Sequence, residues 1–99
     1  MNKKRFKTLT DAVGAIEGLK TRAENLKSDA KQLAEDIESV RVTVEECKDL
    51  EEIAHDNLPE SLQFSDKGFA MEDIINGLEN AVDDLESAVG DINDALSNY

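Results

Sequence analysis

The C-terminal third of the chain carries a regular seven-residue repeat of apolar positions. From Met71 to Tyr99 each heptad opens with a large apolar residue and has further apolar residues at its fourth and fifth positions. The first column is Met71, Leu78, Leu85, Ile92 and Tyr99, the second is Ile74, Ala81, Ala88 and Ala95, and the third is Ile75, Val82, Val89 and Leu96. This spacing predicts an amphipathic helix with a wide apolar side and an acidic back.

A second heptad pattern begins at Leu9. Its first positions are Leu9, Ile16, Ala23, Ala30, Ile37 and Val44, and its fourth positions are Ala12, Leu19, Leu26, Leu33, Val40 and Cys47. Twelve positions in succession keep the alternating three- and four-residue spacing, which predicts a long helix packed as a coiled coil. Cys47 occupies one of these core positions, so we expect it to be a small buried hydrophobic residue rather than a nucleophile.

The two patterns predict a single all-α domain, built as a long two-helix antiparallel hairpin. We expect helices over about residues 9–57 and 66–98, joined by a connector over residues 58–65, because short connectors make successive helices antiparallel neighbours. Residues 1–7 are expected to be frayed. Tyr99 would then lie beside residues 25–28.

Turn and capping residues set the expected boundaries. Thr8 or Thr10 would cap the first helix and Ser65 the second. Pro59 disfavours helical geometry at the residue before it, so the first helix should end near Asn57. The same proline is suited to begin a single helical turn that runs through Gln63.

Charge is distributed unevenly along the chain. Residues 1–31 hold eight Lys or Arg against four Asp or Glu, whereas residues 59–99 hold one against ten, and the formal net charge is −12. This balance disfavours direct binding to nucleic acid or anionic membranes, and favours partners with basic surfaces.

The apolar side of the second helix is wider than one neighbour covers, so we expect a homodimer or a dimer of dimers, an oligomeric helical bundle. A second copy packed antiparallel would bring the basic residues Lys20, Arg22 and Lys27 near acids of the C-terminal helix. The predicted oligomer interface is Ile75, Leu78, Val82, Leu85, Val89, Ile92 and Leu96.

Several classes of chemistry are not expected. The spacing Glu52-x-x-His55 occurs in di-iron bundles, but no inward heptad position supplies the further carboxylates, so we expect a solvated surface histidine and no metal. We expect neither catalytic residues nor a cofactor, because no Gly-rich phosphate loop, Cys-x-x-Cys pair or Asp-rich calcium loop is present. One cysteine and the lack of an apolar signal or membrane-spanning run favour the cytoplasm.

The acidic back of the second helix has two interpretations: a solvated face that keeps an oligomer soluble, or a set of carboxylates that mimics DNA or RNA in a protein's binding channel. Its residues are Glu72, Asp73, Glu79, Asp83, Asp84, Glu86, Asp91 and Asp94. In the connector, a simple turn does not require Glu60, Gln63 or Lys67, so these three are further candidates for partner binding.

The segment NLPESLQFSDKGFAMEDIINGLENAVDDLESAV, residues 57–89, resembles the C-terminal half of small acidic helical proteins encoded by bacteriophages and prophages, which share N-L-P-E-x-L-Q-x-S-x-x-G before Leu/Ala heptads. The resemblance covers roughly residues 57–96. That family has no assigned activity, so the resemblance implies a viral setting rather than a mechanism. The leading hypothesis is a non-enzymatic anti-defence protein that binds and inhibits or modulates a host defence or nucleic-acid enzyme.

Two alternatives remain open at this point. The first is an oligomeric sponge that sequesters a nucleotide immune signal, in which Arg22, Arg41 and Lys67 would contact the phosphates. The second is a structural coiled-coil scaffold.

Overall fold

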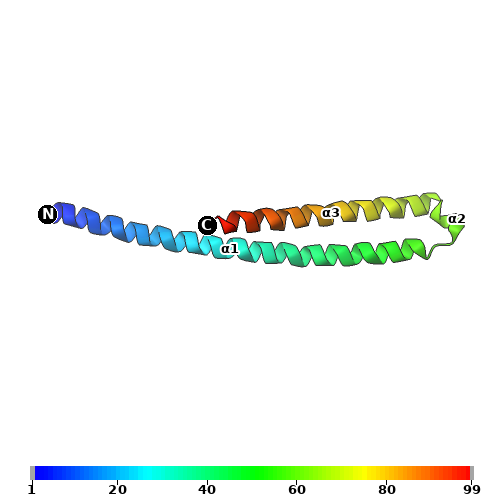
Figure 1. Cartoon of the computed structure of the whole chain (residues 1–99), viewed down its shortest axis with the longest axis horizontal. Helices are drawn as coiled ribbons and strands as arrows, with labels where there is room; N and C mark the ends of the chain where they lie inside the picture. The colour runs from blue at the N-terminus through cyan, green and yellow to red at the C-terminus, as the bar shows by residue number, and fades with distance from the viewer. Residues whose placement is uncertain (1, 99) are drawn as a thin grey trace.

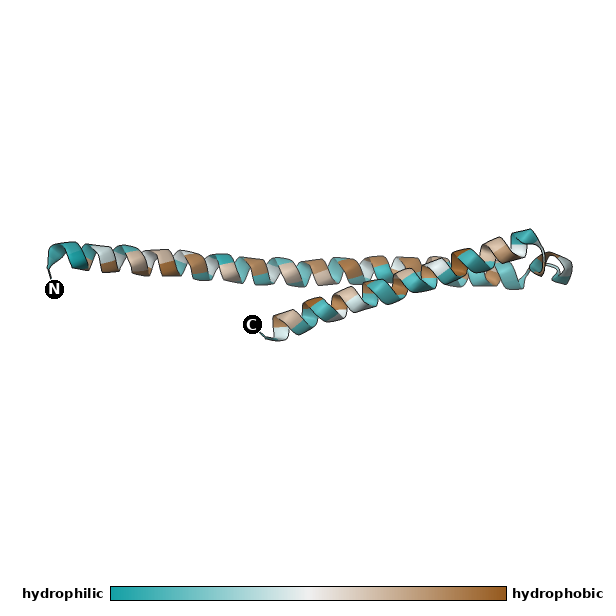
Figure 2. Cartoon of the chain, turned by 90° about the horizontal axis from the view of Figure 1, so that it is seen from above, coloured by the Kyte–Doolittle hydropathy of each residue, from teal (hydrophilic) through white to brown (hydrophobic). Residues whose placement is uncertain are grey.

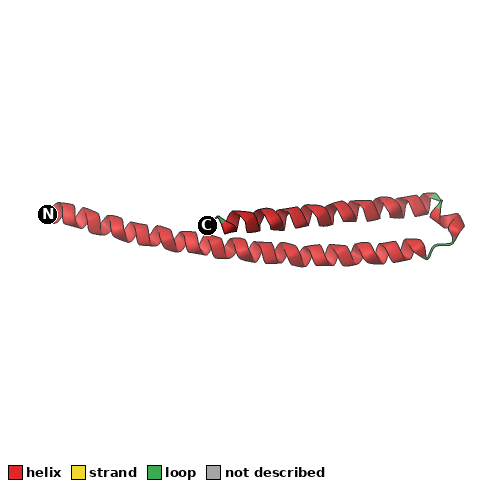
Figure 3. Ribbon diagram, in the orientation of Figure 1, coloured by secondary structure: helices red, strands yellow, loops and turns green. Residues whose placement is uncertain are grey.

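The computed structural model describes residues 2–98, which form a hairpin of two long helices (Figures 1 and 3). Helix α1 spans Lys3–Asp56, α2 is a single turn at Glu60–Gln63, and α3 spans Asp66–Ser97. No strand occurs in this part of the chain. The predicted all-α antiparallel hairpin is therefore confirmed.

The molecule is a rod of 90 × 18 × 15 Å with a radius of gyration of 25.2 Å, about twice the roughly 13 Å of a compact domain of this length. Helix α3 runs back along α1 only as far as its middle (Figure 1). Near the end of α3, Ile92 and Leu96 line a pocket together with Leu26 and Ala30 of α1. The preceding part of α1, residues 3–25, extends past the end of α3 without a neighbouring helix among residues 2–98 and is called here the N-terminal overhang.

Helix α1 begins earlier than the sequence pattern suggested. Its N-cap is Asn2, whose Oδ1 accepts a hydrogen bond of 2.8 Å from the backbone N–H of Arg5. The hydroxyls of Thr8 and Thr10 donate to carbonyls four residues back, within the helix. The predicted start at residue 9 and the predicted threonine caps were wrong, because an asparagine ahead of the apolar pattern supplies a better acceptor.

A side chain of the connector is hydrogen-bonded to the end of α1. Helix α1 ends at Asp56 and α2 follows Pro59, as expected. Gln63 donates from Nε2 to the carbonyl oxygens of Asp56 and Leu58, at 3.2 and 3.0 Å. Carbonyls at a helix C-terminus lack intrahelical partners, so this side chain satisfies groups that would otherwise be left unpaired.

Helix α3 starts in close contact with the connector. Ser65 has an extended backbone in front of the helix, as a capping residue should, but its hydroxyl donates to the carbonyl of Leu62 at 2.5 Å and does not cap α3. Gly68 is buried, and a Cβ atom there would lie 2.1 Å from the carbonyl oxygen of Gln63. Glycine is therefore required for α3 to pass α2 at this distance.

The seam between α1 and α3 buries few side chains completely. Its most buried apolar residues are Ala34 and Val82, at 6% and 7% exposure. The first and third apolar columns of α3 are its buried and half-buried side, which packs on α1 of the same chain. The predicted intersubunit residues lie on this side: Ile75, Leu78, Val82, Leu85, Val89, Ile92 and Leu96. These seven residues pack on α1 of the same chain, and their contact with a second copy stays a prediction.

The fourth-position column of α1 turns away from α3 instead of into the seam. Leu26, Leu33 and Val40 are each more than half exposed, and Cys47 is exposed as well. The expectation of a buried Cys47 was wrong, because α1 contacts α3 through its first-position column and the column four residues later. A heptad pattern does not determine how far a helix rotates about its own axis.

Helix geometry places the outer column of α1 and the second column of α3 on the same side of the hairpin. Near the end of α3, residues on this side line a largely apolar pocket of about 230 Å³. We call this side the apolar face; it consists of Leu26, Leu33, Val40 and Cys47 of α1 with Ile74, Ala81, Ala88 and Ala95 of α3. Figure 2 shows that apolar residues also continue along α1 beyond the end of α3.

Candidate interaction surfaces

The side of the seam opposite the apolar face carries a ladder of ionisable residues. Arg41, Lys48 and His55 are spaced by one heptad on α1, and Glu86, Glu79 and Glu72 have the same spacing in the opposite direction on α3. Arg41 Nη1 lies 3.6 Å from Glu86 Oε1, and His55 Nε2 lies 3.4 Å from Glu72 Oε1.

At the middle step of the ladder, Lys48 Nζ lies 3.8 Å from Asp49 and 4.0 Å from Glu52 of its own helix. The two outer steps still fix the same antiparallel register, because moving either helix by one turn would break both pairs. The heptad spacing of Arg41, Lys48 and His55 against three acids is a sequence signal that the apolar columns alone do not reveal.

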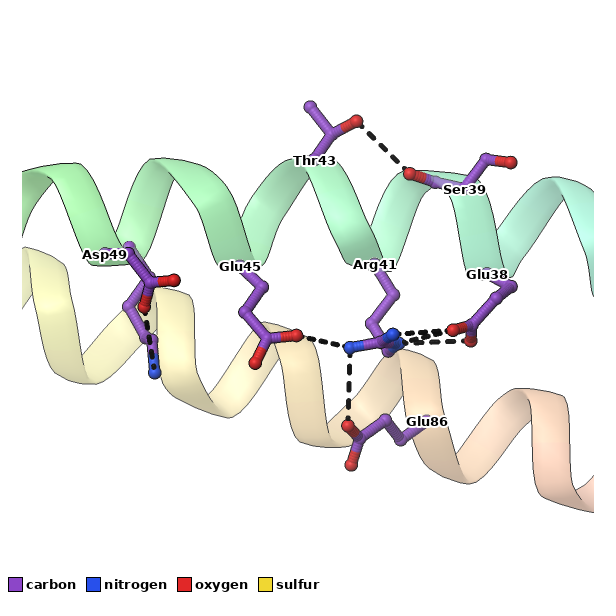
Figure 4. Close-up of polar contacts among 8 residues, drawn as sticks. Glu38, Ser39, Arg41, Thr43, Glu45, Asp49 and Glu86 are labelled. Atoms are coloured by element: carbon purple, nitrogen blue, oxygen red, sulfur yellow. Dashed lines mark hydrogen bonds and ion pairs between the residues drawn. The ribbon is translucent and has the colours of Figure 1, made fainter.

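Arg41 of the ladder contacts three carboxylates, those of Glu38, Glu45 and Glu86 (Figure 4). Its side chain is 17% exposed. Nε donates to both carboxylate oxygens of Glu38 at 3.0 Å, Nη2 donates to Glu38 Oε1 at 2.6 Å, and Nη1 donates to Glu45. The hydrogen bonds to Glu38 raise the pKa of Arg41, and the same bonds lower the pKa of Glu38. The cluster holds one guanidinium among three carboxylates.

The three cations proposed for a nucleotide sponge lie apart along the rod. Arg22 is on the overhang, Arg41 is in the seam, and Lys67 is in the first turn of α3 at the hairpin end. A phosphate at Arg41 would have to displace Glu38 and Glu45. One chain therefore does not assemble these three residues into a site.

His55 is not the solvated residue that the sequence suggested. Its side chain is 14% exposed, Nδ1 lies 3.7 Å from Asp56 Oδ1, and Nε2 is buried without a hydrogen bond, 3.4 Å from Glu72. The correction follows from the rotation of α1, which turns the column of His55 toward α3. Over residues 2–98 no group of three potential ligands is arranged to hold a metal ion.

The acidic back of α3 divides into two sets. Glu72, Glu79 and Glu86 lie on the side of α3 that carries the ladder, where Glu86 is near Arg41 and Glu72 is near His55. The remaining acids are exposed, and no ion pair within 4 Å involves them in the part of the chain that the structure describes. We call these the outer acids: Asp73, Asp83, Asp84, Asp91 and Asp94.

The three candidate residues of the connector differ in their exposure to solvent. Gln63 is half-buried and bonded to the end of α1, so its role here is structural. Glu60 and Lys67 are exposed at the hairpin end. Of the three connector candidates, these two are accessible to a partner.

The N-terminal overhang exposes both apolar and basic residues. Its large apolar side chains, each at least 51% exposed, are Phe6, Leu9, Val13, Ile16 and Leu19. The segment also holds six Lys or Arg against three Asp or Glu, whereas α3 holds one against nine. A basic amphipathic helix without a neighbour therefore extends from an acidic hairpin.

Comparison of the chain with protein-family models, curated proteins and solved structures finds no match. Within residues 2–98, neither long helix has an apolar stretch sufficient to cross a bilayer.

Proposed function

We propose that this chain is a non-enzymatic helical protein that acts by binding a second protein through the outer acids of α3. The observation that supports this is the row of exposed carboxylates on a helix that packs along α1 through the seam. Asp73, Asp83 and Asp94 are about 15 to 17 Å apart in succession at 1.5 Å per residue. Such a row attracts a basic surface, and the attraction weakens with salt.

The partner class we propose is a protein that itself binds nucleic acid, with the acids taking the place of phosphates. Together with the resemblance of residues 57–96 to small phage proteins, this makes an anti-defence inhibitor of a host nucleic-acid enzyme the leading proposal. Glu60 and Lys67 would supply further contacts at the hairpin end.

The test is affinity capture from a bacterial lysate, with the captured protein identified, purified and titrated against variants. Asp73→Asn with Asp83→Asn and Asp94→Asn removes three outer acids and should weaken binding by tenfold or more. The control, Glu24→Gln with Glu35→Gln and Glu46→Gln, makes the same charge change on α1 and should have little effect.

Duplex DNA should displace a partner held by mimicry, and binding should fall steeply as salt is raised. Binding that is unchanged in the outer-acid variant and insensitive to salt would contradict the proposal.

A second candidate, a structural scaffold, is favoured by one observation, the apolar overhang that has no neighbour in the chain. It predicts assemblies of the purified protein larger than a dimer, visible by light scattering. A discrete small species under all concentrations tested would exclude it.

A further inference from the structure

The chain exposes more surface than a folded monomer of its size. Its accessible surface is 7596 Å², whereas a folded monomer of 10.9 kDa exposes about 5,600 Å². The excess is about 2,000 Å² per chain. Two chains that buried it would form an interface of about 4,000 Å², which lies in the range of obligate homodimers.

The lengths of the helices show how a second copy fits. Helix α1 has 54 residues with its midpoint near residue 30, and α3 ends beside Leu26 and Ala30. Helix α3 therefore covers one half of α1 and leaves the other half bare. Two copies placed antiparallel about this midpoint would bring each bare half beside the covered half of the other.

We propose that two copies of this chain form an antiparallel rod, in which the N-terminal overhang of each packs along the apolar face of the other. At every level the rod then contains three helices: the two α1 helices and one of the two α3 helices. This assembly does not depend on the proposed function.

The side chains of the overhang and of the apolar face are complementary in size. The overhang presents large side chains such as Leu9, Ile16 and Leu19, and the apolar face presents a column of alanines on α3 beside leucine and valine on α1. Small residues on one helix let a second helix approach closely, so large side chains of the overhang fill the space beside Ala81 and Ala88. Figure 2 shows the apolar residues that the overhang offers.

The charges of the two copies are also complementary in this antiparallel register. Residue 20 of one copy falls near residue 40 of the other α1, which is the level at which Arg41 meets Glu86 of α3. Lys20 and Arg22 of the overhang therefore lie beside the α3 edge that carries Asp84 and Asp91. A parallel arrangement would instead place overhang beside overhang and repel them.

The first experiment is a charge swap followed by sedimentation or light scattering at micromolar concentration. Wild type should be a dimer. Lys20→Glu with Arg22→Glu, and separately Asp84→Lys with Asp91→Lys, should each weaken self-association by at least tenfold. An equimolar mixture of the two variants should recover a heterodimer.

The control is Asp73→Lys with Asp94→Lys, which makes the same change on the outer side of α3 and should leave the dimer intact. A monomeric wild type, or a mixture that fails to recover association, would overturn the proposal. Helical circular dichroism of each variant, measured in parallel, verifies that the hairpin itself has folded.

The second experiment uses the exposed cysteine. In the antiparallel rod the two Cys47 residues are about 50 Å apart, so mild oxidation should produce no covalent dimer of wild type. Ala12 occupies the same column near the level of Cys47 of the other copy. Ala12→Cys should therefore give a dimer cross-linked between positions 12 and 47, identified by peptide mapping, while a link between like positions would show a parallel arrangement and overturn the proposal.

Discussion

Gly68 shows how one residue without a side chain determines the geometry of the hairpin end. Its Cα lies so close to the last turn of α2 that any Cβ would meet backbone atoms of Leu62 and Gln63. Backbone cannot move aside as a flexible side chain does. The glycine is therefore a packing requirement, although its backbone conformation is ordinary helix.

Gly68→Ala should destabilise the protein by about 1 to 3 kcal/mol, the range for overpacking. Gly90 is a matched control on the same helix, since a Cβ there meets nothing within 4 Å. Gly90→Ala should stabilise by about 1 kcal/mol through helix propensity. Urea denaturation measures both changes, and the same sign for the two variants would contradict this account.

Arg41 makes the stability of the seam depend on pH. Its hydrogen bonds lower the pKa of Glu38 in the folded chain, so this stabilisation is fully present above the ordinary carboxyl pKa of 4.5. It is lost as the pH falls through the lowered value, because the carboxylate then becomes protonated.

The melting temperature of Arg41→Met should therefore be lower than that of wild type at pH 7, and the difference should shrink as the pH drops below about 4.5. Comparing the two proteins at each pH cancels the general effect of titrating the other acids. A difference that stays constant down to pH 3 would exclude the carboxylate cluster as its source.

At the scale of the elements, α3 meets α1 through large apolar residues such as Leu78 and Leu85, whereas α1 adds the small residue Ala34 and the charged Arg41 to the seam. Ala34 faces the α3 side of the seam at 6% exposure and lines a pocket with Val89. The close approach of the helices depends on this small side chain. The charged ladder on the same side then fixes which turn of α3 lies beside which turn of α1.

Ala34→Leu should push the helices apart and destabilise the chain by about 1 to 3 kcal/mol. Ser39→Leu, on the exposed side of α1, adds a similar apolar side chain and should change stability by no more than about 0.5 kcal/mol. Thermal denaturation followed by circular dichroism compares them. Equal effects would mean that α1 does not present this side to α3.

At the scale of the whole molecule, the overhang is a helix without tertiary support in one chain. Isolated helices depend on length and propensity, and the exposed Gly14 and Gly18 each disfavour this one by about 1 kcal/mol. Its helicity should therefore require the neighbouring copy. Once the copies separate, this segment should be the first to unfold.

Dilution should accordingly lower the ellipticity at 222 nm, and hydrogen exchange of residues 3–25 should become faster while that of the seam changes less. The measurement is made on wild type from tens of micromolar to nanomolar concentration. Helicity and exchange that are independent of concentration would show that the overhang is stable alone.

The sequence by itself determined the two helices, the turn at Pro59 and the antiparallel hairpin, because helical periodicity and turn chemistry act between near neighbours in the chain. Only the tertiary structure decided which apolar columns meet. The rotation of each helix about its axis depends on both partners at once, through the ladder of Arg41 and His55 and the small residue Ala34. That rotation exposes Cys47, packs the seven residues expected between copies against α1, and leaves the overhang and the apolar face as surfaces open to a second chain.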